Sequence, residues 1–133
     1  RRDWSSDVCS SDLKKVKVNT KAAYTGTYGL RLRKKQWAEV AVPTTGYDTL
    51  HLMVDRRSSK RYDSGESFKI RWTVGSGWND LDVSSGDSWG GDLVFNLPAG
   101  AENNPQFIFR FQSYSNLRNA FCDFDNLTLI VCL

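Results

Sequence analysis

The sequence predicts an all-β fold, an antiparallel β-sandwich, on the strength of three observations. Short runs in which apolar and polar residues alternate recur along most of the chain, and a period of two is typical of strands with one buried face. Clusters of Gly, Pro, Ser, Asn and Asp separate these runs, as expected of tight turns. No stretch of useful length repeats apolar residues at the spacing of an amphipathic helix. Many short strands joined by such turns favour a sandwich.

The first half of the chain contains the longest alternating runs. In residues 49–55, leucines and a valine alternate with His51, Met53 and Asp55, so the two sets point to opposite sides of a strand. In residues 67–74, large apolar residues alternate in the same way with charged and polar ones. The strands predicted in this half are 15–19, 28–34, 36–42, 49–55 and 67–74.

The second half continues the pattern with shorter runs. Phe107, Phe109 and Phe111 fall on one face of a predicted strand and therefore on the core side. Gly75 and Gly77 permit the positive φ angles of a tight hairpin between the runs that flank them. The strands predicted in this half are 78–83, 92–97, 106–112 and 124–131.

The first residues differ from the rest of the chain. Residues 1–13 read RRDWSSDVCSSDL and follow neither period; the string DWSSDVCSSDL resembles the conceptual translation of a common sequencing adapter. We therefore predict that residues 1–13 are a non-native or disordered tail, and we exclude Trp4 and Cys9 from any site. Residues 14–133 are predicted to form a single β-sandwich domain that is truncated at its N-terminus.

Charge and hydropathy narrow the classes of partner. The net charge of the chain is +3, and its basic residues gather in segments 31–35 and 56–61. A nucleic-acid-binding protein would need these two segments to merge on one face. The alternative is a solvated strand and a solvated loop, so we do not expect a nucleic-acid partner. No apolar run approaches the ~20 residues of a membrane span, and membrane insertion is not expected.

Two cysteines remain in the predicted domain. If Cys122 and Cys132 lay on one extended strand, their Cα atoms would be about 30 Å apart, too far for a disulfide. They can pair only if the chain bends between them. As free thiols they would be ordinary small core residues.

Several strings resemble a known group of modules in the right order along the chain. They are YTGTYGLRLR, TTGYDTLHLMVDRR, GESFKIRWTVGSGWNDL, FIFRFQ and FCDFDNLTL. They are similar to strands of carbohydrate-binding-module and MAM-like jelly rolls, which are galactose-binding-domain-like. The resemblance implies a jelly-roll sandwich and a non-catalytic ancillary module of a secreted or cell-surface protein. The hairpin VGSGW departs from the family by lacking the acidic residue usual in its turn.

The residues give little support to a catalytic function. His51 is the only histidine and would have to serve as the base of any Ser-His-Asp arrangement. Asp123 and Asp125 share one face of a strand and could serve glycoside hydrolysis, but a domain this small leaves little room for a deep cleft. One histidine and two thiols fall short of a zinc site. We therefore predict that the protein is not an enzyme.

The resemblance also implies a structural calcium ion. In related jelly rolls it sits where the last strand meets the turn before the first long strand, which implies Asp125 as a carboxylate ligand and the carbonyl near Gly26 as a backbone ligand. Calcium prefers such mixtures of carboxylate and carbonyl oxygens. The alternative is a hydrogen-bonded Asp125 that ties the two chain ends together.

Strand faces suggest where a glycan could bind. If the strands at 49–55, 67–74 and 106–112 are neighbours in one sheet, their outward side chains form a polar floor. Sugar hydroxyl groups pair well with such donors and acceptors, whereas the alternative is a solvated face with cross-strand charge pairs. The floor would consist of His51, Asp55, Arg71, Arg110 and Gln112.

A sugar site usually adds a flat aromatic surface. Trp89 and Tyr114 lie in expected loops and are the best candidates, followed by Tyr62. Trp37 breaks the apolar face of its strand and is expected to be exposed, whereas Trp72 is expected in the core. Packing at the sandwich edge is the alternative for each candidate. Trp78 follows the hairpin, as the structural tryptophan of related modules does.

Together these inferences predict a non-catalytic carbohydrate-binding module of a larger secreted or cell-surface protein. Its expected partners are a glycan or polysaccharide and the other domains of the parent protein, and its expected location is extracellular. The alternative is a structural or adhesion module of the MAM-like kind that contacts proteins. A broad apolar patch without a groove would favour that alternative.

Overall fold

The computed structural model describes residues 17–19, 29–59, 62–85, 89–117 and 119–132. The predicted tail at residues 1–13 and the proposed calcium ligand at Gly26 lie outside these residues, so both remain predictions. The single-domain boundary at residue 14 also remains a prediction.

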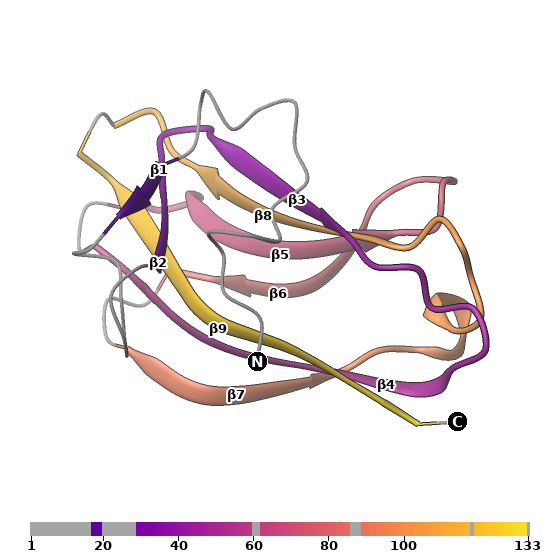
Figure 1. The fold of residues 1–133 in the computed structure, drawn as a ribbon. Coiled ribbons are helices and arrows are strands. Elements are labelled where there is room, and N and C mark those ends of the chain that lie inside the picture. The colour runs from indigo at the N-terminus through magenta and orange to yellow at the C-terminus, as the bar shows by residue number, and fades with distance from the viewer. Residues whose placement is uncertain (1–16, 20–28, 60–61, 86–88, 118, 133) are drawn as a thin grey trace.

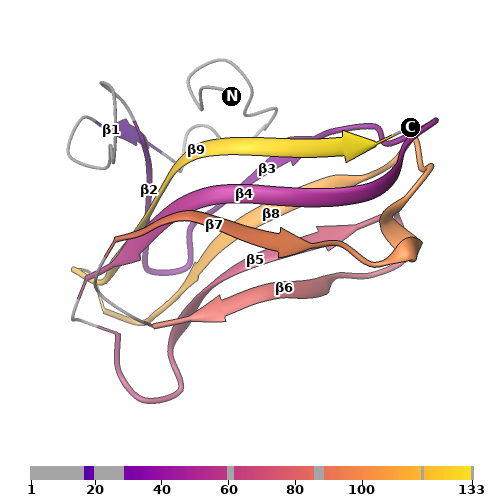
Figure 2. The ribbon, with the colours of Figure 1, turned by 90° about the horizontal axis from the view of Figure 1, so that it is seen from below.

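The described chain forms two antiparallel sheets that face each other, as Figure 1 shows. One sheet has five strands in the order β1-β2-β9-β4-β7, and the other has four in the order β3-β8-β5-β6. Seen from below in Figure 2, β9, β4 and β7 lie in one layer and β8, β5 and β6 in the other. The strands are β1 (Lys17–Asn19), β2 (Gly29–Arg33), β3 (Trp37–Ala41), β4 (Asp48–Ser58), β5 (Ser67–Thr73), β6 (Asn79–Ser84), β7 (Gly90–Asn96), β8 (Ile108–Tyr114) and β9 (Phe121–Cys132).

This architecture confirms the prediction of an all-β antiparallel sandwich with a jelly-roll arrangement. Each predicted strand appears within a few residues of its expected place, because the alternation reflects a real buried face. In β5, the pattern of buried and half-buried positions follows the sequence alternation residue by residue until Thr73, which is buried as well. A 3₁₀ turn, η2 (Ala99–Ala101), precedes β8.

Phenylalanines from both sheets form the centre of the core. The ring of Phe124 in β9 lies 5.1 Å from that of Phe111 in β8 and 5.8 Å from that of Phe68 in β5, centroid to centroid. Phe109 and Phe107 extend this row along the four-stranded sheet, with centroids 4.8 Å apart. Truncating one such ring to alanine typically lowers the free energy of unfolding by about 3–5 kcal/mol. This row therefore contributes strongly to the packing of the two sheets against each other.

The predicted hairpin joins β5 and β6. Gly75 and Gly77 adopt φ angles of +105° and +116°, a region that favours glycine. A Cβ atom on Gly75 would lie 2.7 Å from Oε1 of Gln106. This oxygen is the far end of a flexible side chain that can turn away, so the hairpin depends on glycine at position 75 for φ rather than for space.

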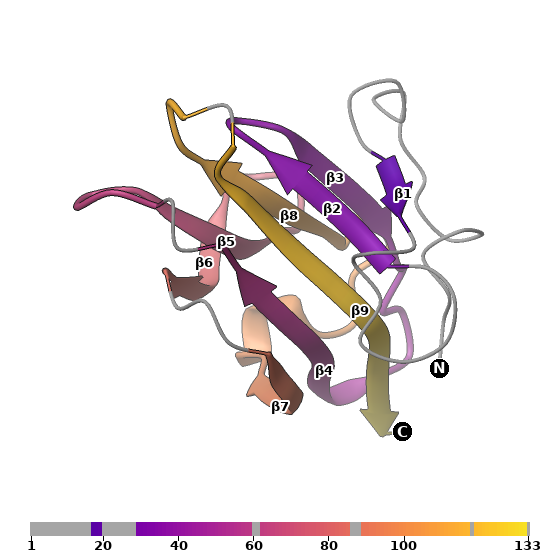
Figure 3. The same cartoon turned by 90° about the vertical axis from the view of Figure 1, so that its left-hand side faces the viewer.

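One expectation about neighbouring strands is wrong. The strands that carry His51, Arg71 and Arg110 do not belong to one sheet, because β4 pairs with β7 and β9 whereas β5 pairs with β8. Figure 3 shows β4 in the layer of β9 and β2, apart from β5 and β8. The chain crosses from one sheet to the other between β4 and β5, and alternation within a strand does not reveal such a crossing.

Both cysteines of the predicted domain lie in β9, Cys122 near its start and Cys132 at its end. Cys122 is a free thiol, completely buried in the core. Burial raises the pKa of this thiol well above its ordinary value, and the nearby charge of Asp123 acts in the same direction. A buried thiol held in its neutral form is an inert core group.

Candidate functional site

The outer side of the four-stranded sheet gathers aromatic and charged side chains on neighbouring strands. Alternation turns Ala38, Val40 and the phenylalanines of β8 inward, where they are fully buried, and turns their neighbours outward. Trp78 joins this surface from the residue just before β6. We call this surface the four-stranded face; it consists of Trp37, Glu39, Lys69, Arg71, Trp78, Asp80, Arg110, Gln112 and Tyr114.

A row of four charges crosses this face from one edge of the sheet to the other. Glu39, Arg110, Arg71 and Asp80 are cross-strand partners on β3, β8, β5 and β6. Glu39 accepts hydrogen bonds from Nε and Nη2 of Arg110 at 3.1 and 2.7 Å. Nε of Arg71 lies 2.8 Å from Oδ1 of Asp80. Each arginine is therefore balanced by the carboxylate beside it.

Arg110 also contacts two indole rings. Its guanidinium carbon lies 4.4 Å from the ring centroid of Trp37 and 4.1 Å from that of Trp78. Such cation–π contacts, together with the bond to Glu39, limit the rotamers of all three large side chains. The face thus presents two indoles fixed at either side of a hydrogen-bonding group.

A second polar group lies one row along the sheet. The hydroxyl of Tyr114 donates to Oε1 of Gln112 at 2.7 Å and accepts from Nη1 of Arg71 at 3.2 Å. Nζ of Lys69 lies 4.7 Å from the centroid of the Tyr114 ring. These contacts link the tyrosine to the row of charges, so the polar surface is continuous.

A shallow depression of about 530 Å³ adjoins this end of the sheet. Its lining includes Glu66 and Ser67 on one side and Val83 and Ser84 on the other. Ser67 and Val83 are cross-strand partners of Tyr114 and Lys69, so the depression continues the four-stranded face.

The structure brings four of the predicted ligand residues together and separates the other three from them. Arg71, Arg110, Gln112 and Tyr114 lie on the four-stranded face, although Tyr114 ends β8 rather than lying in a loop. His51 and Asp55 lie apart from this face, because their strand is not a neighbour of β5 and β8, and Trp89, outside the strands as expected, lies on the other sheet's side as well. The residues of this second group belong to β4 or directly precede β7, and both strands are in the five-stranded sheet.

Each of the three separated residues has a local partner. His51 hydrogen-bonds through Nδ1 to Oδ1 of Asn96, 2.5 Å away on β7. Asp55 is buried and accepts a hydrogen bond from Nδ2 of Asn126 at 2.6 Å. The Trp89 ring lies under the guanidinium group of Arg57, at 4.8 Å. None of these contacts involves the four-stranded face.

The remaining aromatic candidates divide between surface and core. Trp72 is buried and stacks on Phe107, as predicted. Tyr62 packs against Phe68 and hydrogen-bonds to Ser113. Burial raises the pKa of this tyrosine far above its ordinary value, so Tyr62 belongs to the core edge and not to an open platform. Tyr62 therefore packs at the edge of the sandwich, which was the alternative to an exposed aromatic platform.

Sequence reasoning noticed Trp37 but did not place it in the site. It shares the phase of Glu39 in β3, and this phase indicates an outward side chain. Trp78 was assigned a structural role through the resemblance, whereas it contacts Arg110 on the outside of the sheet. Its place after the hairpin carries no alternation, so no pattern could have assigned its side.

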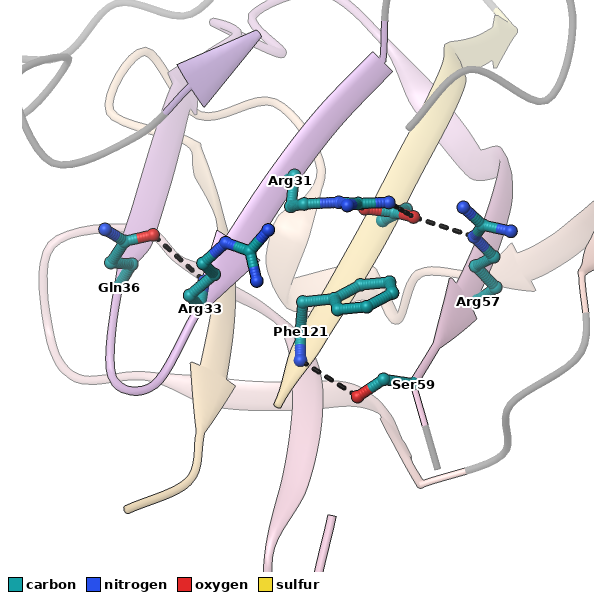
Figure 4. A network of polar contacts seen from close by, with 7 residues as sticks. Arg31, Arg33, Gln36, Arg57, Ser59 and Phe121 are labelled. Carbon is teal, nitrogen blue, oxygen red and sulfur yellow. Dashed lines mark hydrogen bonds and ion pairs between the residues drawn. The ribbon is translucent and has the colours of Figure 1, made fainter. Parts of the chain in front are cut away.

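The outer side of the five-stranded sheet carries a different cluster, shown in Figure 4. Asp123 is 0% exposed and accepts from Nε and Nη2 of Arg31 at 2.7 and 2.9 Å and from Nε of Arg57 at 2.7 Å. Arg31 is itself only 8% exposed. Asp123 therefore serves as the anchor of two arginines.

Asp125 was predicted to ligate calcium. It is buried, and its cross-strand partner is the equally buried Asp55. Two residues of β9, Asn126 and Leu127, oppose Val54 alone, and this bulge places the amide N–H of Asn126 2.8 Å from Oδ1 of Asp125. The carboxylates of Asp55 and Asp125 and the side-chain carbonyl of Asn126 provide oxygen atoms of the kind that calcium prefers, while the N–H groups of Asn126 donate to both carboxylates. In the part of the chain that the structure describes, no group of three His, Cys, Asp or Glu side chains is placed to hold a metal.

The described residues contain no helix long and apolar enough to cross a membrane.

Comparison with known proteins shows which solved structures have a similar fold. No protein-family model matches the chain, and no curated protein matches it. The solved structure "Family 16 Carbohydrate Binding Module-2" is similar with a TM-score of 0.54 and 22% identity, over 87% of this chain and 85% of the other. The structure of TmCBM61 in complex with β-1,4-galactotriose has a TM-score of 0.55 and 14% identity, over 92% and 86% of the two chains. The chain therefore has the β-sandwich fold found in carbohydrate-binding modules.

Proposed function

We propose that the protein is a non-catalytic carbohydrate-binding module that holds its glycan on the four-stranded face. The observation that carries this proposal is Arg110 fixed between the indoles of Trp37 and Trp78 and bonded to Glu39. Its fold, shared with modules of this class, supports the same function by analogy.

The chemistry of this face suits a sugar ring. A pyranose has C–H surface on its faces and hydroxyl groups at its rim, so it needs a flat aromatic ring beside groups that donate and accept. The indole of Trp37 supplies the former. Glu39, Arg110 and Gln112 supply the latter. Glu39 and Arg110 hold each other in position, and Tyr114 holds Gln112, which lowers the entropic cost of binding.

The charge balance of the face favours a neutral glycan. In the row from Glu39 to Asp80, the two arginines are neighbours in the middle, and each has a carboxylate partner on its outer side at 2.7–2.8 Å. A charged sugar would have to compete with one of these pairs, whereas hydroxyl groups can add hydrogen bonds to both partners. We therefore expect a neutral oligosaccharide.

The test is glycan-array binding followed by calorimetry with the best neutral oligosaccharide. Trp37→Ala and Trp78→Ala each should weaken binding by about ten-fold or more, the usual effect of removing a central aromatic anchor. Trp89→Ala is the matched control, because this indole lies on the other sheet and should leave the affinity unchanged. Loss of binding in Trp89→Ala but not in Trp37→Ala would refute the proposed face.

The protein-contact alternative has less support. Among the described residues, the exposed large hydrophobic side chains are Val83 and Val94. They lie on β6 and β7, which belong to different sheets. A docking module of the MAM-like kind would need a broader apolar patch.

A structural calcium ion at Asp125 forms part of the proposal. Asp55 and Asn126 offer further oxygen atoms beside Asp125, and such a set fits calcium better than softer metals. The melting temperature should fall when a chelator is added and recover with calcium. In Asp125→Asn it should no longer respond to the chelator; an equal response in both proteins would place calcium elsewhere.

We also propose that the module belongs to a larger secreted or cell-surface protein. This rests on the resemblance of its strand motifs to ancillary modules and on the shared fold.

A further inference from the structure

Arginines from both basic segments of the sequence, Arg31 and Arg33 from one and Arg57 from the other, meet on the outer side of the five-stranded sheet. β2 and β4 both pair with β9, one on each side, so their outward arginines approach the same β9 residue. The guanidinium carbons of Arg31, Arg33 and Arg57 lie 3.9, 5.5 and 5.9 Å from the ring centroid of Phe121. Figure 4 shows the three side chains around this ring. Arg31 and Arg33 of the first basic segment therefore share one face with Arg57 of the second, whereas Arg56 pairs with Asp82 between the sheets.

These arginines differ in what they offer to a ligand. Arg31 is buried and committed to Asp123 through two hydrogen bonds, and it acts as a fixed support. Arg57 uses Nε for Asp123 and remains 28% exposed. Arg33 is exposed, and its backbone is held by Oε1 of Gln36, which accepts from the Arg33 amide at 2.9 Å.

The turn that follows β2 adds positive charge at the same end of the sheet. We call this end the rim; it consists of Arg33, Lys34, Lys35, Arg57 and Phe121. Lys34 and Lys35 are exposed and directly follow Arg33. Lys34 has a φ of +53°, which reverses the chain so that Gln36 can donate its amide to the carbonyl of Arg33 at 2.9 Å. The turn is therefore ordered: Arg33 lies over the Phe121 ring, and the backbone amide of Lys34 donates to the carbonyl of Ala120 at 3.4 Å.

We propose that this rim is a second site, independent of the four-stranded face, that binds the acidic group of a sugar. A planar guanidinium pairs well with a carboxylate or a sulfate, and the Phe121 ring limits how far the guanidinium groups can move. Arg33 and Arg57 contact the acidic group, with Lys34 and Lys35 at its edge. The shared chemistry of the ligand is a carboxylate- or sulfate-bearing saccharide.

The extent of the cluster favours an acidic sugar over a nucleic acid. A bound nucleic acid would need a track of basic groups matching successive phosphates. Further along β4 and β9, this side of the sheet carries the buried carboxylates Asp55 and Asp125 instead. Among the described residues of β4 and β9, this side therefore carries its arginine near Phe121 and carboxylates further along, which matches one or two acidic groups rather than a long phosphate chain.

The experiment compares binding of the full chain to four immobilised probes of similar length. They are a sulfated oligosaccharide, an oligogalacturonate, a neutral oligogalactan and single-stranded DNA. The variants are Arg33→Gln, the triple variant Arg33→Gln/Lys34→Gln/Lys35→Gln, and Lys69→Gln as the matched control, which removes a positive charge from the other face. Circular dichroism and melting establish that each variant is folded.

The proposal expects binding to at least one acidic saccharide that weakens as salt is added. Arg33→Gln should weaken it several-fold and the triple variant by about ten-fold or more, whereas Lys69→Gln and Trp37→Ala should leave it unchanged. The sulfated and uronate probes distinguish the two sources of the acidic group. Because Trp37→Ala affects only the neutral probe, failure of the second site is separable from failure of the first.

Three results would overturn the proposal. The folded protein could bind neither acidic saccharide at low salt. Lys69→Gln could weaken acidic binding as much as Arg33→Gln, which would indicate a general charge effect. Finally, DNA could bind as tightly as the acidic saccharides and with the same sensitivity to the triple variant, which would make a nucleic acid the occupant.

Discussion

The two outer faces of the sandwich use the same pair types and differ in how deeply these are buried. On the four-stranded face, Glu39 and Arg110 are each 21% exposed, and the arginine rests against indoles that solvent or ligand can reach. On the five-stranded sheet, Asp123 is 0% and Arg31 8% exposed, and an aromatic ring again lies beside the arginine. The same arginine–carboxylate–aromatic unit is thus partly open to solvent in one place and enclosed by the fold in the other.

The difference in burial determines how much stability each face should lose when one member of an ion pair is removed. A carboxylate and an arginine at the surface gain little from pairing, because water and salt screen them. A buried pair gains little over apolar replacements as well, but removing one partner leaves a charge without compensation in a poor solvent. The five-stranded sheet should therefore be sensitive to loss of a single partner, and the four-stranded face should tolerate it.

The largest expected effect tests this contrast directly. Asp123→Asn leaves the buried Arg31 without its carboxylate and should lower the free energy of unfolding by about 3–5 kcal/mol. Glu39→Gln makes the same chemical change in the half-exposed pair and should cost less than about 1 kcal/mol. Urea denaturation of both variants measures the two values. Equal costs would show that burial does not separate the faces.

A smaller loss of stability is expected when the ion pair that lies between the two sheets is broken. Arg56 of β4 points inward and pairs with Asp82 of β6, Nε to Oδ2 at 2.5 Å, which links the two sheets. Its guanidinium also lies 5.3 Å from the ring centroid of Phe68. Asp82→Asn should cost about 1–3 kcal/mol, because Arg56 loses its carboxylate but retains some solvent and the ring.

The control for this inter-sheet pair is Asp80→Asn, two residues away on the outer side of β6. Asp80 is 43% exposed, so its loss should change stability by less than about 1 kcal/mol. An Asp80 variant as unstable as the Asp82 variant would mean that β6 depends on charge and not on the link between the sheets.

The sequence predicted the strands well because their determinants are local. Alternation in residues 67–74 and 106–112 reflects one buried face, and it correctly turned Arg71, Arg110 and Gln112 outward. Gly75 and Gly77 likewise predicted the hairpin, because glycine adopts positive φ angles without help from distant contacts. For these residues, the local pattern and the final environment agree.

The missing part of the site depends on long-range pairing. His51 and Asp55 alternate outward as predicted, but β4 joins β7 and β9 rather than β5, and no local pattern specifies which sheet a strand enters. Trp89 lies apart from the site because the chain returns to the five-stranded sheet between β6 and β7. Trp78 entered it through a contact with Arg110, which depends on how the hairpin folds back over the sheet.

The next prediction sharpens the functional side of the comparison. Arg110→Lys keeps the positive charge beside Glu39 but removes the planar group between Trp37 and Trp78. We expect affinity for a neutral oligosaccharide to fall by about ten-fold, with a change in unfolding free energy below about 1 kcal/mol. Calorimetric titration and urea denaturation measure both. A large loss of stability without loss of affinity would make Arg110 a structural residue like Arg31.

The smallest effect concerns Glu66, a carboxylate near the end of the four-stranded face. It accepts hydrogen bonds from the backbone amides of Asp63 and Asn116 at 2.9 and 2.8 Å and from the hydroxyl of Ser115 at 2.9 Å. These bonds, that from Asp63 foremost, lower the pKa of Glu66 below its ordinary value of 4.5. Unlike Asp123, it is stabilised by neutral donors at the surface.

Because the pKa of Glu66 is lower in the folded than in the unfolded protein, its ionised form stabilises the fold. This contribution is complete above the unfolded pKa near 4.5 and disappears as the pH falls through the folded pKa. Glu66→Gln should therefore lower the melting temperature slightly at pH 7, with the difference from the unmodified chain shrinking toward pH 3. Melting curves across that range measure it, with Glu102→Gln as a control at a partly buried glutamate that accepts a longer bond, 3.2 Å, from the amide of Thr49. A difference that grows on acidification would mean that the loops around Ser115 are held by the protonated acid, contrary to the bonding pattern.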